Sequence, residues 1–232
     1  FRDGEAGSRH NPEFTLLEWY RVGFDHHRLM DEVAELVSEL LAGKLALAEP
    51  ERLSYGDIFR HHLNLDPHRA TVAELAACAE RLNLSIPPGM PADDPDPWLD
   101  LLLTHRIELE LGRGRLTFVY DYPASQAALA RLRPGDPPVG ERFELYVNGI
   151  ELANGFHELG DAAEQRRRFE RENAVRQASG LPVMPVDEHL LAALDAGLPD
   201  CAGVALGFDR LVMLAAGKNS LAEVLAFPLD RA

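Results

Sequence analysis

Residues 144–158 read Glu-Leu-Tyr-Val-Asn-Gly-Ile-Glu-Leu-Ala-Asn-Gly-Phe-His-Glu, and this stretch decides how the chain is organised. Two runs of β-favouring residues flank Asn148-Gly149. An Asn-Gly pair suits the left-handed conformations of a two-residue type I′ turn. The pattern therefore predicts a β-hairpin. Its expected cross-strand pairs are Val147–Ile150, Tyr146–Glu151 and Leu145–Leu152.

One face of this hairpin is acidic. Side chains alternate along a strand, so Glu144, Tyr146 and Glu151 share a face, and the two glutamates are diagonal neighbours roughly 7–8 Å apart. The other face is apolar and carries Leu145, Val147, Ile150 and Leu152. Two carboxylates aimed together repel unless a positive group lies between them, and a hard divalent cation such as Mg²⁺ carrying phosphate oxygens would suit. From spacing alone, a hairpin with one wet acidic face is the simpler interpretation.

Composition limits the possible functions. The chain has 232 residues, of which 46% are hydrophobic, enough for one large domain or two small ones. A formal net charge of −15 argues against nucleic-acid binding, which needs a basic face, but allows a basic protein partner. Cys78 and Cys201 have no paired spacing, which favours a reducing compartment. No apolar run reaches transmembrane length and no signal peptide is recognisable, so we expect a cytoplasmic protein without membrane association.

The first twenty residues combine basic side chains with a strand pattern. Residues 1–10 are dense in charge and glycine, and residues 11–20 alternate like a strand, with Phe14, Leu16 and Glu18 on one face. The basic residues of this segment include Arg2, Arg9 and His10. A strand–loop–strand carrying such side chains could hold a polyphosphate by charge-assisted hydrogen bonds. An ordinary exposed loop remains the alternative.

Helical spacing and capping boxes recur along the rest of the chain. The pattern predicts helices over 27–43, 54–63, 71–82, 98–110, 161–179 and 188–196, and a strand over 116–123. Residues 54–112 have the composition of a helical hairpin without evident chemistry, and we expect them to be an insertion. A glycine-rich strand at 203–207 then enters a helix with Arg210 in its first turn, where the helix dipole also favours anions.

Jointly, these segments resemble the catalytic domain of class II aminoacyl-tRNA synthetases. Residues 1–20 look like motif 2, and residues 203–214 look like motif 3. The lysyl branch matches through Arg-His-Asn-Pro-Glu-Phe-Thr at 9–15, Glu18, Tyr20 and residues 151–158. The resemblance covers essentially the whole chain and implies an α+β fold, with an antiparallel sheet flanked by helices. Motif 1, which usually builds the dimer interface, would lie before Phe1, so a homodimer is expected when that region is present.

Other segments resemble a paralogous family of the lysyl branch that modifies elongation factor P. They are Tyr-Pro-Ala-Ser-Gln-Ala-Ala-Leu at 122–129, Cys201, Ala205 in place of a motif glycine, and the ending at 226–232. That family activates β-lysine with ATP and transfers it to a lysine of elongation factor P, so tRNA is an unlikely partner. Two alternatives stay open: a fragment of a true lysyl-tRNA synthetase, and a non-catalytic synthetase-like binding module.

The resemblance also implies a role for each site residue. ATP would be held by Arg2, Arg9, His10, Phe14 and Arg210, of which Arg2 and Arg210 would be catalytic. Mg²⁺ would bind Glu144 and Glu151. Lysine or β-lysine would contact Glu18, Tyr20, Asn154, Phe156, Glu158 and Ala205. Strict alternation puts Asn154 on the face opposite Glu151, so a β-bulge near Asn154-Gly155 is expected. Gly4 stands where motif 2 usually has glutamate, and Glu5 follows it, so the adenine contact expected there stays open.

Overall fold

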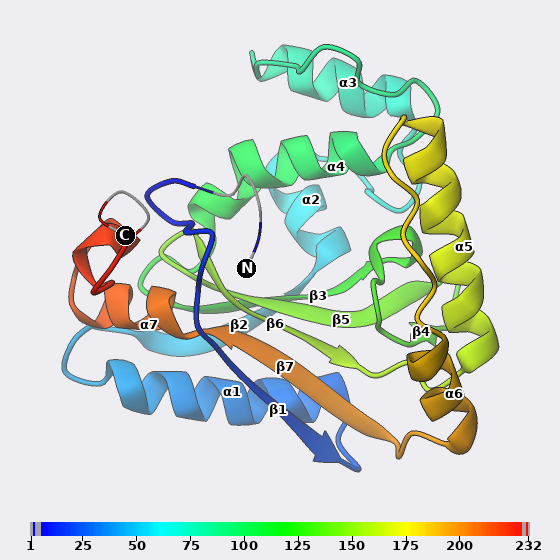
Figure 1. Cartoon of the computed structure of the whole chain (residues 1–232). Helices are drawn as coiled ribbons and strands as arrows, with labels where there is room; N and C mark the ends of the chain where they lie inside the picture. The colour runs from blue at the N-terminus through cyan, green and yellow to red at the C-terminus, as the bar shows by residue number, and fades with distance from the viewer. Residues whose placement is uncertain (1, 3–5, 229–230, 232) are drawn as a thin grey trace.

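The computed structural model describes residue 2, residues 6–228 and residue 231. Within these residues seven strands form one sheet in the order β1-β7-β6-β5-β3-β2, with β4 paired to β5 (Figure 1). The strands are β1 (Leu16–Val22), β2 (Ala48–Ser54), β3 (Arg115–Pro123), β4 (Leu132–Arg133), β5 (Val139–Val147), β6 (Ile150–His157) and β7 (Cys201–Gly207). The α-helices are α1 (His26–Leu41), α2 (Tyr55–Leu63), α3 (Val72–Arg81), α4 (Asp96–Leu102), α5 (Ala162–Ala178), α6 (Glu188–Ala196) and α7 (Phe208–Ala215).

The sheet is antiparallel at every junction except one. The β5 segment that contains Glu144 pairs antiparallel with both β3 and β6, as the sequence predicted. The edge strand β2 runs parallel to β3 because helices α2 to α4 form the crossover between them. Strand β2 was not predicted, because its run Ala-Glu-Pro-Glu-Arg-Leu-Ser is charged and contains Pro50. An edge position tolerates proline because one side of the strand needs no partner.

The central hairpin forms with one correction to its register. Asn148 and Gly149 have φ values of 50° and 69°, as a type I′ turn requires. The pairs Val147–Ile150 and Tyr146–Glu151 form, but Leu145 pairs with Ala153, so the predicted Leu145–Leu152 pair is wrong. A bulge at Leu152 lets Leu152 and Ala153, although consecutive, both pack in the core. The bulge thus lies earlier than expected, and it brings Asn154 opposite Glu144.

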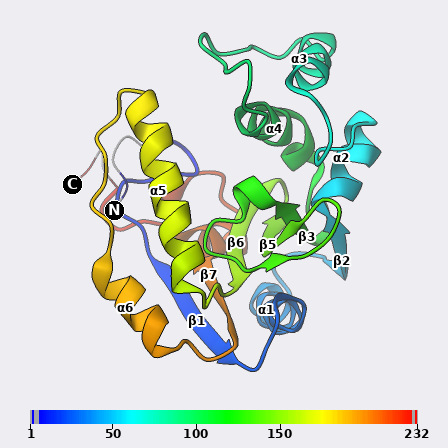
Figure 2. The same cartoon turned by 90° about the vertical axis from the view of Figure 1, so that its right-hand side faces the viewer.

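The sheet separates two hydrophobic cores. On the face that we call lower, α1 and α7 pack against residues such as Leu145, Val147 and Leu206. On the opposite, upper face, α2, α3 and α4 pack with one another and against Val119 and Tyr146 (Figure 2). The helical crossover leaves the upper face of β1, β7 and β6 to the N-terminal segment, which runs above it in Figure 1.

Local helix signals proved more reliable than helix lengths. The predicted caps Ser54, Thr71 and Asp161 each accept a hydrogen bond from the backbone amide three residues later. The single helix predicted over 98–110 is wrong, because α4 ends at Leu102 and continues as a π-helical turn and then a 3₁₀ turn as far as Glu110. No helix among the described residues combines the length and the apolarity needed to cross a bilayer.

Candidate active site

Two adjacent cross-strand rows gather polar side chains on the upper face. The first row, read from strand to strand, is Glu18 on β1, Ala205 on β7, Asn154 on β6 and Glu144 on β5. The second row, two residues along, is Tyr20, Gly203, Phe156 and Arg142. Residues two apart in a strand share a face, so both rows project to the same side. Four strands therefore build one site.

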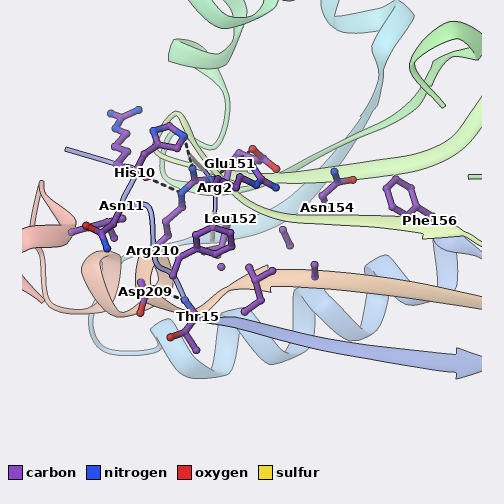
Figure 3. Close-up of a pocket in the computed structure, with 17 residues that line it drawn as sticks. Arg2, His10, Asn11, Thr15, Glu151, Leu152, Asn154, Phe156, Asp209 and Arg210 are labelled. Atoms are coloured by element: carbon purple, nitrogen blue, oxygen red, sulfur yellow. Dashed lines mark hydrogen bonds and ion pairs between the residues drawn. The ribbon is translucent and has the colours of Figure 1, made fainter. Parts of the chain in front are cut away.

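Most of the predicted site residues line a single cavity above these rows (Figure 3). Those in its wall are Arg2, Arg9, His10, Phe14, Glu151, Asn154, Phe156, Ala205 and Arg210. The others, Glu18, Tyr20, Glu144 and Glu158, lie outside this wall. Gly4 and Glu5, on which the adenine contact of motif 2 depends, lie outside the described residues.

Arg210 ties three parts of the cavity together. Its Nη1 donates to the Glu151 carbonyl at 2.7 Å and lies 3.7 Å from the Glu151 carboxylate. Its Nη2 lies 2.9 Å from His10 Nε2, and its Nε donates to the Arg9 carbonyl at 3.3 Å. Figure 3 shows Arg210 extending from the start of α7 toward the N-terminal loop that carries Arg9 and His10. A short glycine-rich strand followed by a helix thus delivers a guanidinium to the cavity wall.

The N-terminal loop is fixed on both sides of the cavity. Arg9 Nη1 donates to the Gly149 carbonyl at 2.9 Å, which fastens the loop to the hairpin turn. The Thr15 amide donates to Asp209 Oδ2 at 2.7 Å, which fastens it to α7. Arg2 Cζ lies 5.5 Å from the centroid of the Phe14 ring, a cation–π distance. The result is a cavity end with several guanidinium groups around an aromatic ring.

Glu144 and Glu151 lie on the same face of the hairpin, as predicted. Glu144 is buried, forms an ion pair with Arg142 and accepts a hydrogen bond from Tyr146 Oη at 2.6 Å. The protein atoms around Glu151 and then the neighbouring Glu144 carboxylate raise the pKa of Glu151 to about 7. Part of this rise comes from the neighbouring carboxylate, and a cation between the two groups would relieve that repulsion.

A second acidic group lies at the far end of the rows. Burial raises the pKa of Glu158 to about 7. Burial, followed by the nearby charges of Glu158 and Glu18, raises the pKa of Tyr20. A Cβ atom on Gly203 would lie 2.6 Å from both Glu158 Oε1 and Tyr20 Cε1, so Gly203 makes room for the two side chains. We call Glu18, Tyr20 and Glu158 the acidic end, and the cavity region around Arg2, Arg9 and Arg210 the basic end.

Sequence reasoning missed several charged residues beside Glu144. Arg142 lies on β5 with its guanidinium 4.4 Å from the Tyr122 ring. On α4, Asp96 accepts a hydrogen bond from Ser125 at 2.8 Å and Asp100 accepts one from Gln126 at 3.0 Å, and Asp100 lies close enough to Glu144 to feel its charge. The missed acids share a physical property: burial raises the pKa of Asp96, of Asp100 (to about 6) and of Glu108.

Two signals could have revealed these residues. Arg142 stands two positions before Glu144, so strand alternation places them on one face. Asp96 and Asp100 are four apart, which places them on one side of a helix. That this side faces β5 follows only from the tertiary packing of the crossover helices.

The arrangement of strand rows, arginine loop and glycine-rich strand matches a known family. The family model of class II tRNA synthetases (D, K and N) matches residues 1–231. The chain belongs to this family. Elongation factor P–(R)-β-lysine ligases from Klebsiella pneumoniae subsp. pneumoniae, Klebsiella pneumoniae strain 342 and Salmonella dublin are each 53% identical to it over 232 residues. These alignments cover 100% of this chain and 70% of each relative.

The chain is thus also a member of the elongation factor P–(R)-β-lysine ligase family. Class II membership accounts for the mainly antiparallel sheet, and the whole-chain identity confirms the resemblance that residues 122–129 and Ala205 suggested. Identity at this level to named ligases favours the ligase interpretation over a tRNA-charging fragment or a non-catalytic module.

Proposed function

We propose that the chain activates (R)-β-lysine with ATP as an aminoacyl-adenylate and transfers it to a lysine side chain of elongation factor P. The observation that carries this proposal is a single upper-face site with a basic end and an acidic end. The basic end suits the phosphates of ATP, and the acidic end suits the distal ammonium of a diamino acid. Family membership agrees with this pairing of substrates.

The basic end would serve the activation step. The lysine carboxylate forms a bond to the α-phosphorus of ATP, and the bond to the bridging oxygen breaks, releasing pyrophosphate. Arg2 would offset the charge that builds on the α-phosphate, while Arg9, His10 and Arg210 would hold the outer phosphates. Phe14 and Arg210 would stack on either side of the adenine. In the transfer step the acceptor amine attacks the activated carbonyl, AMP leaves and the amine loses a proton.

Glu144 and Glu151 would hold Mg²⁺. The raised pKa of Glu151, caused first by burial and then by the Glu144 charge, supports this fit, because a divalent cation beside both carboxylates would stabilise their charged forms. When bound, the ion supplies charge neutralisation for the phosphate oxygens. The chain's own contribution is to place the two carboxylates on one face of a rigid type I′ hairpin, with Arg142 and Tyr146 orienting Glu144.

The acidic end and the two cross-strand rows of the upper face would select the amino acid. Glu18, Tyr20 and Glu158 would bind the distal ammonium, and Phe156 would lie along the alkyl stem. Asn154 carries a buried Oδ1 atom without a hydrogen-bond partner among the described residues, which suits a polar group of the substrate. Ala205 lies between Glu18 and Asn154 in the first row. Its methyl group would remove space at the pocket floor and favour the β-isomer over α-lysine.

The protein would work in the cytoplasm as a homodimer, with elongation factor P and not tRNA as its acceptor. The exposed edge strand β1, on which Leu17 and Val22 are 43% and 72% exposed, supports an assembly surface on that side. The net charge of −15 supports a protein acceptor over tRNA.

Transfer of labelled (R)-β-lysine by the full-length protein tests the function. We expect label to appear on elongation factor P in the presence of ATP and Mg²⁺, and not on a variant factor whose acceptor lysine is replaced by arginine. Efficient charging of tRNA with α-lysine, with no label on the factor, would show that the protein is a lysyl-tRNA synthetase instead.

A further inference from the structure

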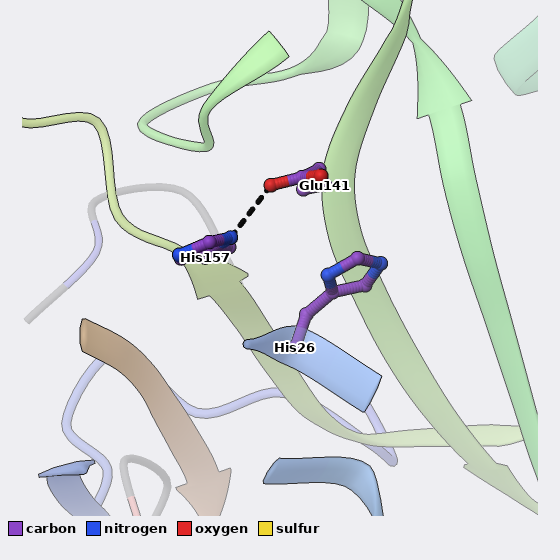
Figure 4. A group of neighbouring side chains, drawn as sticks. All are labelled: His26, Glu141 and His157. Carbon is purple, nitrogen blue, oxygen red and sulfur yellow. Dashed lines mark hydrogen bonds and ion pairs between the residues drawn. The ribbon is translucent and has the colours of Figure 1, made fainter. Parts of the chain in front are cut away.

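A second cluster of ligand-type side chains lies on the lower face of the sheet, away from the cavity. His26 is the first residue of α1, Glu141 lies on β5, and His157 is the last residue of β6. One nitrogen or oxygen atom from each lies within 4.8 Å of the others. Figure 4 shows the three side chains around a shared space. Two imidazoles and a carboxylate from three separate elements thus converge at one point.

His26 has no role in the packing that its polarity would explain. It is 2% exposed, and neither of its ring nitrogens makes a hydrogen bond within the described part of the chain. A buried polar group without a partner costs free energy, so such groups usually have one. The nearest carboxylate atom, Asp121 Oδ1, is 3.8 Å from His26 Nε2 and is likewise buried and unpartnered. His26 Nε2 and Asp121 Oδ1 therefore lie at ion-pair distance, but neither makes a hydrogen bond within the described residues.

Asp121 has an unusual backbone conformation. It has a φ of 61°, in the left-handed region that non-glycine residues seldom adopt, at a register shift of β3. Its Oδ2 atom pairs with Arg133, which leaves Oδ1 directed at the cluster. Strained residues of this kind often occur at ligand sites.

His157 lies between two carboxylates, one at each ring nitrogen. Its Nδ1 lies 2.6 Å from Glu141 Oε2, and its Nε2 lies 3.0 Å from Asp200 Oδ1. An imidazolium donates to both carboxylates, whereas a neutral imidazole can donate to only one of them. A metal at Nδ1 would let Glu141 become a ligand while Nε2–H donates to Asp200, the carboxylate–histidine–metal arrangement common in metalloproteins.

Charge also favours a cation at this point. Glu141, Asp121 and Asp200 carry three negative charges, and Arg131 and Arg133, which pair with Asp200 and Asp121, carry two positive charges. These five side chains together carry an excess of one negative charge, which an imidazolium at His157 or a bound cation would neutralise. Imidazole ligands suit Zn²⁺ and similar transition metals, whereas Mg²⁺ prefers oxygen ligands.

We propose that His26, Glu141 and His157 form a binding site for Zn²⁺ or a similar transition metal. A water molecule would complete the coordination, and Asp121 lies beside His26. Metal–ligand distances of about 2.0–2.2 Å place tetrahedral ligand atoms about 3.3 Å apart. The three ligand atoms lie within 4.8 Å of one another, so they need to close by at most about 1.5 Å.

The metal site would influence the active site from the opposite, lower face of the sheet. His157 stands between Phe156 and Glu158, whose side chains belong to the upper-face site. A metal at His157 would fasten this strand end to α1 and β5, and so hold both substrate residues in place. It is a positioning site, and it takes no part in the chemistry. The metal proposal itself does not depend on which substrate is used.

Zn²⁺ titration of the full-length, chelator-treated protein in millimolar Mg²⁺ tests the site by calorimetry. We expect one Zn²⁺ per chain with a dissociation constant of about 1 μM or tighter. Loss of an outer partner of a metal-bound histidine usually weakens metal binding about 10–100-fold, so Asp200→Asn should lower the affinity for Zn²⁺ by that factor. His26→Gln, which removes a ligand, should lower the affinity at least about 100-fold. His27→Gln is the matched control, because His27 is the next residue of the same helix and is half-buried. The dissociation constant of this variant for Zn²⁺ should stay within about twofold of the wild-type value, a difference of less than about 1 kcal/mol.

Two further measurements separate metal binding from damage to the fold. Zn²⁺ should raise the melting temperature of the wild type and of His27→Gln, but not of His26→Gln or Glu141→Gln. Co²⁺ in place of Zn²⁺ should give the visible absorption of a four-coordinate site in the wild type. Absence of saturable Zn²⁺ binding in the wild type would overturn the proposal. So would equal affinity in wild type, His26→Gln and Glu141→Gln, which would place the ion elsewhere.

Discussion

The two ends of the upper-face site are stabilised in opposite ways. At the basic end, Arg9 and Arg210 are already engaged by backbone carbonyls of Gly149, Glu151 and the N-terminal loop. At the acidic end, Glu158 has no such support, and burial raises its pKa to about 7. The basic end is therefore preorganised by hydrogen bonds, whereas the acidic end is poised to gain its charge when a cation arrives. We expect damage at the first to slow the chemistry and damage at the second to weaken substrate binding.

The largest effect is expected for Glu151→Gln. Loss of one carboxylate from the metal pair should lower the rate of ATP–pyrophosphate exchange at least about 10³-fold, because several kcal/mol of charge stabilisation are lost. The melting temperature should stay within a few degrees of wild type, since Glu151 lies at the cavity wall and not in the core. Glu49→Gln, which changes an exposed acid on β2, is the control. An unchanged exchange rate would mean that the hairpin is only an acidic surface.

Arg2→Ala should follow, with a loss of about 10²–10³-fold in kcat and a small change in KM for β-lysine. The reason is that Arg2 would act on charge that develops only as the α-phosphorus is attacked. Steady-state exchange kinetics separate the two constants, and Arg106→Ala, a surface arginine remote from the cavity, serves as the control. A change confined to KM for β-lysine would contradict the division into two ends.

Glu158→Gln should change mainly KM for β-lysine and leave kcat nearly unchanged, the opposite of Arg2→Ala. We expect KM for β-lysine to rise about 10–100-fold, because a charged hydrogen bond to the ammonium is worth roughly 1.5–3 kcal/mol. In the wild type, KM should also rise as pH falls below about 7, because protonated Glu158 does not attract the ammonium. This pH dependence should disappear in the Gln variant. A parallel fall of kcat with unchanged KM would place Glu158 in the chemistry.

The same substitution should stabilise the ligand-free protein. The folded-state pKa of Glu158, about 7, lies above its ordinary 4.5, so the folded state binds more protons than the unfolded state between these values. The contribution of Glu158 to the free energy of unfolding therefore falls as pH rises from 4.5 to about 7. Denaturant unfolding at pH 8 should show Glu158→Gln more stable by about 1–2 kcal/mol after allowance for solvent screening, and nearly equal at pH 4.5. A variant equally stable or weaker at pH 8 would contradict the burial of an unpaired charge.

Ala205→Gly should have the smallest effect, on the choice between isomers. Removing the methyl group should improve use of α-lysine and narrow the preference for β-lysine by about 3–10-fold, which corresponds to about 1 kcal/mol, the lower end of what a methylene of misfit is worth. Ala202→Gly, on the same strand but in the lower-face core, should lower stability without altering the isomer ratio. The exchange rates of both isomers, measured side by side, give the ratio directly.

Local chemistry explains which parts of the fold could be predicted from sequence. Asn148-Gly149 and the caps at Ser54 and Thr71 act through neighbours in the chain, and all three form as expected. The bulge at Leu152 and the strand β2 depend on tertiary packing. Both Leu152 and Ala153 gain by burial, and an edge position tolerates Pro50.

The site residues also differ in whether local sequence or tertiary packing determines their place. Most of the residues that the motif-like segments predicted for the site line one cavity. Asp100 and Glu108 were missed because only the packing of the crossover helices on β5 brings them beside Glu144. The cluster of His26 and His157 joins residues 131 positions apart, which strand alternation alone could not connect.

The most direct test of the division into two ends is a cycle of two enzymes and two substrates. ATP–pyrophosphate exchange would be measured for wild type and Glu158→Gln with (R)-β-lysine and with (R)-3-aminohexanoic acid, which lacks the distal amino group. We predict that wild type strongly prefers β-lysine in kcat/KM, and that Glu158→Gln loses most of this preference by slowing β-lysine alone, a large coupling energy between residue and ammonium. An equal reduction for both substrates would show that Glu158 does not bind the ammonium, and would contradict the assignment of the acidic end.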